Sequence, residues 1–496
     1  MVAKLLDCPA VRTRRIDIYI YCSAVAAIGI LGPPVPLYWD SFGYVVQAMT
    51  GQVGGLGLGR PLFVLVSHAL AMLWFAFRGS AAHLEPVLRM WWAIVTCLAA
   101  PLTWRLARRA GLTYRASALA GLAVAVSPAM AHVGGSVLTD GPATAMCVLA
   151  SLLGVQAILD SWEAMPSPGR RAIGLAIGAG VVVGVAIGLR EQSILGAAGL
   201  ALLLPIARRE DRRLLAAAMA VACVLVVAVP MLVIWLIEPG YAATIRTWLL
   251  GMAHDRAAMT FGWRDAGLFA LWVLSLGPVV AIAAAIAWCR PTSPMWRAGG
   301  ALFAISVPAL AQLALTVAFR GISYSPRFML PAFPCAVAIP GAWAIDRWVG
   351  RSRRHFVAAC LLIVLPLVIG APVVRERSAP VIAAIRTLPE LLAVVPPTSV
   401  VVTGQPCPEI ALEQAIAAHD QPGRPAPDWQ PVCPGWAWPS DLTARLDGAR
   451  LANRTVVLDL RPTSWIGSEQ QAALRQIMQY AFAPPTDARP PLILWR

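Results

Sequence analysis

The sequence predicts an α-helical polytopic membrane protein that carries a small α/β domain at its C-terminal end. Of 496 residues, 58% are hydrophobic and only 13% are charged, whereas soluble domains average about a quarter charged residues. Apolar runs long enough to cross a bilayer, roughly 20 residues each, recur over the first 375 residues. These runs are continuous rather than alternating, which excludes a transmembrane β-barrel.

The formal net charge of +15 follows the membrane topology and does not indicate a nucleic-acid-binding surface. Arginines gather in short loops and form no basic stripe, as expected from the positive-inside rule. Near the N-terminus, Arg12, Arg14 and Arg15 precede an apolar run that is too long for a signal-peptide core. We therefore expect a retained signal anchor with a cytoplasmic N-terminus, in a multi-pass protein of the inner (plasma) membrane.

The charge pattern sets the order of about eleven predicted spans. Every second loop carries an arginine cluster, as between 105 and 115 or between 208 and 213, and these loops are assigned to the cytoplasm. The C-terminal domain is then extracytoplasmic (periplasmic). The spans are expected at 17–38, 87–106, 116–134, 143–160, 172–189, 192–207, 214–237, 266–289, 299–319, 328–346 and 356–374.

The segment 61–77 is apolar enough to cross the membrane, but crossing would move every later arginine cluster to the outer side. Pro61 and the preceding "GGLGLG" are typical of a bent or in-plane juxtamembrane helix. We therefore expect this segment to lie within a large first extracytoplasmic loop, residues 39–86.

The composition changes near residue 375 and divides the chain into a transmembrane catalytic domain, 1–375, and an extracytoplasmic α/β domain, 376–496. Short strands are expected at 398–404, 455–460 and 492–495, with helical patterns between them at 380–395, 407–419 and 468–482. Cys407 and Cys433 can form one disulfide if this domain is extracytoplasmic. The other cysteines and the six histidines show no metal-ligand spacing, so no metal is predicted.

Two acidic residues, Asp40 and Asp140, stand at the outer ends of predicted spans. Each can simply cap a helix N-terminus. Together, beside an in-plane helix, they indicate a water-accessible cavity at the membrane surface. An alcohol acceptor has a high pKa and needs a general base, which contributes about 10²–10⁴ in rate. Asp40 is the candidate base.

Arginines at outer loops depart from the positive-inside trend and suit a lipid-phosphate ligand. A guanidinium presents a planar fork to phosphate oxygens, although each such arginine can also meet lipid headgroups. Donor-phosphate contacts are expected from Arg190 in "GLREQS" and from Arg327, with Tyr324 beside it. Further possible substrate contacts are Tyr44, Arg60, His254 and Arg256.

The order of these motifs over residues 17–375 resembles the GT-C class of membrane glycosyltransferases. Asp40 follows the first span and precedes an aromatic residue, and "GRPLF" is similar to a "PPL" motif in the first loop of that class. "SVLTDGPATAMCVLA" resembles the second acidic segment, and "YSPRFMLPAFPCAVAIPGAWAIDR" is similar to a span of the lipid A aminoarabinose transferases and protein O-mannosyltransferases.

The resemblance implies an inverting transfer of one sugar from a polyprenyl-phosphate donor to an acceptor hydroxyl on the extracytoplasmic side, without an essential metal. In this resemblance Asp40 matches the catalytic base, Asp140 the second acidic position, and Arg190 and Arg327 basic positions. The implied partners are membrane lipids, the donor, and an acceptor in cell-envelope glycan or glycolipid such as lipopolysaccharide. The sequence has a single Asp where some protein mannosyltransferases show a paired acidic motif, and it lacks the sugar-binding repeat domains of the eukaryotic enzymes, so a protein acceptor is less expected than a glycan or lipid.

Two other classes of protein stay open. Intramembrane carboxylates also mark ion-coupled transporters, although the sequence shows no repeated halves with broken helices. A non-catalytic envelope assembly protein would use the acidic residues only as helix caps.

Overall fold

The computed structural model forms two compact units. The helical unit comprises Met1–Gly32, Val53–Leu65 and Met90–Pro372, and the mixed unit comprises Pro33–Gln52, Val66–Arg89 and Val373–Arg496. The structure describes residues 9–33, 39–53, 60–163, 169–194, 201, 204–238, 240–243, 245–246, 250, 263–289, 305–307, 309–311, 313, 326–350, 352–386, 395–403, 407–420, 427–433, 442–459, 487–489 and 492–495.

Long apolar helices confirm a multi-pass membrane protein. Within the described residues, five helices are long and apolar enough to cross a bilayer, or up to seven if each bent pair counts as one span. The full number of eleven spans stays a prediction, because half of 192–207 and most of 299–319 lie outside the described residues. The five helices are Ala81–Arg109, Asp140–Trp162, Arg170–Leu189, Arg212–Leu236 and Arg353–Pro372.

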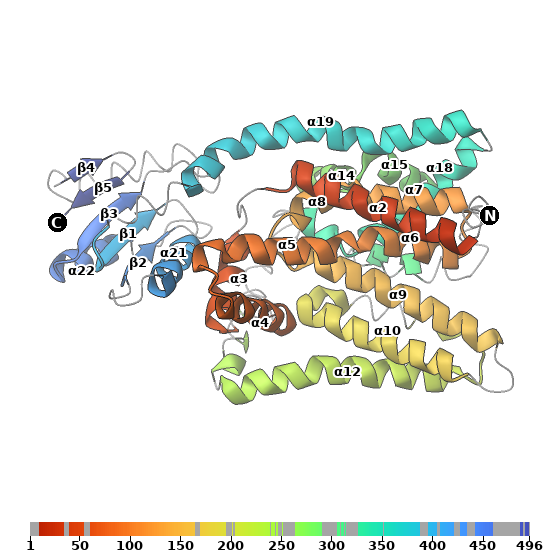
Figure 1. The fold of residues 1–496 in the computed structure, drawn as a ribbon, viewed down its shortest axis with the longest axis horizontal. Helices are drawn as coiled ribbons and strands as arrows, with labels where there is room; N and C mark the ends of the chain where they lie inside the picture. Colours follow the sequence, from red (N-terminus) through yellow and green to blue (C-terminus); the bar gives the residue numbers. More distant parts are fainter. Residues whose placement is uncertain are drawn as a thin grey trace. The chain divides into compact units, whose positions relative to one another are not determined.

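Apart from α3 and η1, the helices that precede the C-terminal sheet run along the chain in the following order (Figure 1). They are α2 (Pro9–Leu31), α4 (Pro61–Ala76), α5 (Leu84–Cys97), α6 (Ala99–Arg109), α7 (Tyr114–Ala125), α8 (Pro128–Gly134), α9 (Asp140–Glu163), α10 (Arg170–Leu189), η2 (Glu191–Ser193), η3 (Leu204–Ile206), α12 (Arg212–Ile237), α14 (Trp263–Leu276), α15 (Pro278–Cys289), η5 (Pro326–Met329), η6 (Pro334–Ala338), α18 (Ile339–Val349) and α19 (Arg353–Arg386).

Helices α9, α10 and α12 lie side by side (Figure 1). Their close approach depends on small residues, as is common between membrane helices. A Cβ atom added at Gly180 of α10 would overlap the Met219 carbonyl oxygen of α12, and one added at Gly184 would lie 2.7 Å from Val226 Cβ. The backbones of α10 and α12 are therefore in direct contact.

Two predicted spans are bent pairs of helices rather than single helices. The span 116–134 breaks between α7 and α8 with a bend of 49°, where the Ser127 hydroxyl caps α8 by accepting from Met130 N at 3.4 Å. The span 266–289 breaks at Gly277, directly before Pro278. Proline lacks an amide proton and favours the first position of a helix, so both breaks have a local sequence cause.

Helix α4 corresponds to the segment 61–77. Its 16 residues rise about 24 Å at 1.5 Å per residue, less than the ~30 Å hydrocarbon core of a bilayer. This length suits an in-plane helix, and that placement stays a prediction.

The mixed unit contains a five-stranded sheet with the order β2-β1-β3-β5-β4. Strands β2, β1 and β3 are parallel, whereas β5 is antiparallel to both β3 and β4. The elements are β1 (Ser399–Thr403), α21 (Cys407–Asp420), β2 (Gln430–Val432), α22 (Leu442–Leu451), β3 (Thr455–Asp459), β4 (Asp487–Arg489) and β5 (Leu492–Trp495), together with α3 (Trp39–Thr50) and η1 (Ala81–His83).

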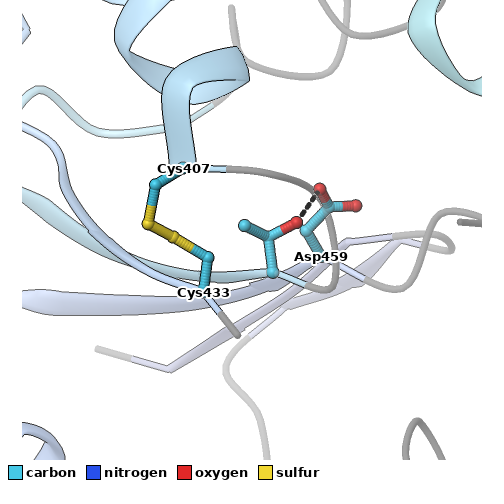
Figure 2. The surroundings of a disulfide bond; sticks show 4 residues. Cys407, Cys433 and Asp459 are labelled. Atoms are coloured by element: carbon cyan, nitrogen blue, oxygen red, sulfur yellow. Dashed lines mark hydrogen bonds between the residues drawn. A yellow bond between two sulfur atoms is a disulfide. The ribbon is translucent and has the colours of Figure 1, made fainter. Parts of the chain in front are cut away.

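The core of the sheet is apolar, and its parallel strands end in a polar cluster. Val401, Ile410, Trp429 and Val457 are buried together in one cluster. Cys407 and Cys433 form a disulfide at this end of the sheet, with Cα atoms 5.6 Å apart (Figure 2). The Thr403 hydroxyl donates to Asp459 Oδ2 at 2.8 Å, where strands β1 and β3 end (Figure 2).

The strands expected at 398–404, 455–460 and 492–495 correspond to β1, β3 and β5, whereas the short β2 and β4 were not expected. Part of the expected helix 380–395 continues α19 as far as Arg386. The expected helix 468–482 lies outside the described residues.

Candidate active site

The centre of the candidate site is an ion pair between Asp140 and Arg190, both only 1% exposed. Asp140 begins α9, and Arg190 directly follows the last residue of α10. Because α9 and α10 are antiparallel neighbours (Figure 1), the start of one lies beside the end of the other. Removing one member of such a buried pair leaves an uncompensated charge and costs about 3–5 kcal/mol.

Arg190 uses its remaining donors within the same site. Its Nη1 donates to the Thr139 hydroxyl at 3.4 Å, and its Nε and Nη2 donate to Gln192 Oε1 at 3.2 and 3.1 Å. Burial lowers the pKa of Arg190 to about 10, with further lowering by Arg60 and Arg327 and an opposing contribution from Asp140. The guanidinium therefore stays charged at neutral pH and is fixed in orientation.

A second ion pair adjoins the first, because Glu191 follows Arg190 in the chain. Arg60 Nε lies 3.4 Å from Glu191 Oε2. Although burial raises the pKa of Glu191, Arg60 and Arg190 outweigh it and hold that pKa below its usual value. Arg60 has a φ of 44°, which is uncommon for a residue with a side chain and often marks a functional position.

Arg327 extends this group from the short helix η5. It is near enough to Arg190 to lower the pKa of that guanidinium. We call these five side chains the charged cluster. It contains three arginines and two carboxylates, which leaves one excess positive charge, and this composition suits an anionic ligand. Its members are Arg60, Asp140, Arg190, Glu191 and Arg327.

The predicted site residues are distributed over both units. Asp40 is half-buried in the first turn of α3, and Tyr44 on the same helix is 1% exposed. Both belong to the mixed unit, whereas the charged cluster belongs to the helical unit. Tyr324, His254 and Arg256 lie outside the described residues. In the part of the chain that the structure describes, no group of three or more His, Cys, Asp or Glu side chains could hold a metal ion.

Sequence reasoning missed Thr139, Glu191 and Gln192 as members of the site. The available signal was the run "LREQS" at the end of an apolar span. Charged residues beside an apolar span usually pair with one another, so a partner for Glu191 could have been sought.

No protein-family model matches this sequence, and no curated protein matches it. Solved structures do match it, and they define the class of fold as that of the GT-C glycosyltransferases. The fold resemblance expected from the sequence motifs is thereby confirmed.

Two of the similar structures are of ArnT from Cupriavidus metallidurans and of the oligosaccharyltransferase AglB from Archaeoglobus fulgidus. ArnT bound to undecaprenyl phosphate is 13% identical, with a TM-score of 0.59, over 98% of this chain and 97% of ArnT. AglB in complex with an inhibitory peptide and a dolichol-phosphate is 13% identical, with a TM-score of 0.55, over 90% of this chain and 69% of AglB. At these identities the likeness concerns the fold.

Proposed function

We propose that this protein is an inverting glycosyltransferase that moves one sugar from a polyprenyl-phosphate-linked donor to an acceptor hydroxyl. The observation that carries the proposal is the charged cluster, with its excess positive charge, in a chain that has the GT-C fold. The structures of ArnT with undecaprenyl phosphate and of AglB with a dolichol-phosphate support a polyprenyl-phosphate donor.

Donor phosphate binds to the positive side of the charged cluster. Arg190 already contacts Asp140, Thr139 and Gln192, so its role is to supply fixed positive charge and to orient Asp140. Arg60 Nε lies 3.4 Å from Glu191 Oε2, and its planar guanidinium suits the phosphate oxygens of the donor. Arg327 acts with Arg60 in the same way.

The reaction needs a base for the acceptor and charge stabilisation for the leaving group. Asp40 takes the proton of the acceptor hydroxyl, whose oxygen then attacks the anomeric carbon of the donor sugar from the face opposite the phosphate. The bond from the anomeric carbon to the phosphate oxygen breaks, and the arginines stabilise the phosphate that leaves. The anomeric configuration is inverted, and no metal is assigned to the reaction.

Asp140 serves to orient a substrate hydroxyl. Its Oδ2 is buried and accepts no hydrogen bond from the described residues, although the carboxylate is paired with Arg190. A buried acceptor without a hydrogen bond is costly, and a substrate hydroxyl would satisfy it. This arrangement supports an assisting role for the second acidic residue.

The reaction takes place on the extracytoplasmic side of the plasma membrane, with a cytoplasmic N-terminus and a periplasmic C-terminal domain. Arginine-rich loops support this orientation, and the disulfide between Cys407 and Cys433 suits an oxidising compartment. The acceptor is a glycan or glycolipid of the cell envelope, including lipopolysaccharide.

A transfer assay with matched arginine variants tests the proposal. The protein is placed in lipid nanodiscs with radiolabelled polyprenyl-phosphate sugars and envelope glycolipid acceptors. Arg60→Gln should lower kcat/KM for the donor by about 10²-fold or more, because phosphate stabilisation of this kind contributes at that scale. Arg78→Gln is the control, since Arg78 also has a positive φ, 61°, but follows α4. Equal activity of both variants would remove Arg60 from the donor site.

Reconstitution of the same protein into sealed lipid vesicles separates an enzyme from a transporter. Labelled sugar that crosses vesicle membranes without becoming attached to an acceptor, and that still does so in Asp40→Asn, would favour the transporter alternative. Neither transfer nor flux with any donor would favour the assembly protein.

A further inference from the structure

The C-terminal domain and the helices of the first loop form one packing unit. Helix α21 contacts both α3 and η1, although the sequence separates them by more than 300 residues. All three elements belong to the mixed unit. At the end of α21, two neighbouring residues, His419 and Asp420, make contacts with α4 and η1.

Asp420, the last residue of α21, caps the N-terminus of η1. Its Oδ1 accepts from Ala81 N at 2.8 Å, and its Oδ2 accepts from Ala82 N at 3.2 Å. Ser80, which precedes η1, makes no side-chain cap of its own. The first amides of a helix have no partner within the helix, so Asp420 supplies what the local sequence does not.

His419 makes the second contact. Its ring stacks on Phe75 near the end of α4, with ring centroids 4.0 Å apart and an interplanar angle of 30°. Its Nδ1 also lies 3.1 Å from Asp420 Oδ1. The end of α21 therefore contacts both α4, through His419, and η1, through Asp420.

Helix α3 is held between this assembly and α4. The His68 ring donates from Nδ1 to the Ala48 carbonyl at 2.7 Å, near the end of α3. Gly51 has a φ of 72°, and a Cβ atom there would lie 3.0 Å from His68 Nε2. The end of α3 is thus fixed against α4, α21 packs on the same helix, and Asp40 stands in its first turn.

We propose that α21 positions α3, and with it the candidate base Asp40, and that Asp420 and His419 are the positioning residues through which it does so. The inference rests on the proposed function, because it needs Asp40 to act as the base. A displacement of about 1 Å at a catalytic group costs about 10²-fold in rate. The C-terminal domain therefore contributes to kcat through the position of α3.

Variants at Asp420 and Phe75 test this in the full-length protein in nanodiscs. Asp420→Ala removes the cap of η1. Asp420→Asn keeps one acceptor oxygen and should therefore behave largely like the wild type. Asp428→Ala is the control, because Asp428 is 65% exposed and pairs with Arg454 at 2.9 Å. Phe75→Leu removes the stack on His419, and its control is Phe77→Leu, since Phe77 is 78% exposed.

Hydrogen exchange of the α3 amides is measured first, because it does not depend on activity. Asp420→Ala and Phe75→Leu should each raise α3 exchange about tenfold, whereas Asp428→Ala and Phe77→Leu should not. In the transfer assay Asp420→Ala should lower kcat about tenfold or more and leave the donor KM within about twofold, as expected for a misplaced base.

Each outcome decides one part of the proposal. Unchanged α3 exchange in Asp420→Ala would overturn it, and so would faster exchange with an unchanged kcat. Retained transfer by Asp40→Asn would overturn the proposed role of Asp40, and with it the catalytic half of this inference, while the exchange data alone would still decide whether α21 holds α3.

Discussion

Two acidic residues with the same sequence signal occupy different environments in the two units. Asp140 starts α9 of the helical unit, is 1% exposed and is paired with a buried arginine. Asp40 lies in the first turn of α3 in the mixed unit and is half-buried. Enzymes that use two carboxylates commonly give them different roles through different surroundings. The difference indicates that Asp140 is held in a buried charged framework, whereas Asp40 keeps the partial exposure that its proposed role, taking a proton from an acceptor hydroxyl, needs.

The largest effect is expected at Asp40. Asp40→Asn keeps the side-chain shape but cannot accept the acceptor proton, so kcat should fall by about 10²–10⁴-fold. The thermal unfolding temperature should change little, because α3 keeps its packing. Steady-state transfer together with a Tm measurement checks both. A variant that transfers sugar at the normal rate would show that the half-buried acid is not the base.

At Asp140 the main effect should be on stability. Asp140→Asn leaves Arg190 buried without its ion-pair partner, which should cost about 3–5 kcal/mol of unfolding free energy. Asp160→Asn is the matched control on the same helix, because Asp160 pairs with Arg171, whose side chain is 74% exposed. Chemical unfolding followed by tryptophan fluorescence gives the difference. Equal unfolding free energies of the two variants would contradict the structural role of Asp140 and remove the contrast with Asp40.

The smallest effect concerns Glu191 and pH. Arginines outweigh burial and hold the pKa of Glu191 below its usual value. The charged form therefore stabilises the folded protein above the unfolded-state pKa, about 4.3 for Glu, and this stabilisation is lost as pH falls through the lower folded-state pKa. The Tm of the wild type should consequently fall more steeply on acidification below about pH 4.3 than the Tm of Glu191→Gln.

Glu210→Gln controls for acidification in general, because Glu210 is 74% exposed and pairs with Arg208. If Glu210→Gln flattened the pH profile as much as Glu191→Gln does, the acid sensitivity would not come from the charged cluster.

The class of fold and the location of the helical site could be predicted from local sequence. Hydropathy placed α9 and α10, and the alternation of arginine-rich loops put Asp140 and Arg190 on one side of the membrane. An antiparallel pair of spans then brings these two ends together. The direct contact between the two side chains was not predicted, because hydropathy carries no information about side-chain direction.

The bent spans and the distant contacts could not be predicted by the same reasoning. A hydropathy average over a whole span ignores single positions such as Pro128 and Gly277, where the helices break. The cap of η1 by Asp420 joins residues far apart in sequence, and nothing in either local sequence indicates the other. The pairing of Arg60 with Glu191 likewise depends on tertiary packing.

The glycines of α10 set how tolerant this part of the protein is to change. Where Gly180 and Gly184 meet α12, the gap between the two helices is fixed by main-chain atoms such as the Met219 carbonyl. A substitution in one side chain can be compensated by a substitution in its neighbour, but main-chain atoms cannot be replaced and have no rotamers. Substitutions are therefore tolerated around this crossing but hardly at Gly180 and Gly184 themselves. The helix spacing that supports Arg190 depends on the absence of a side chain at these two positions.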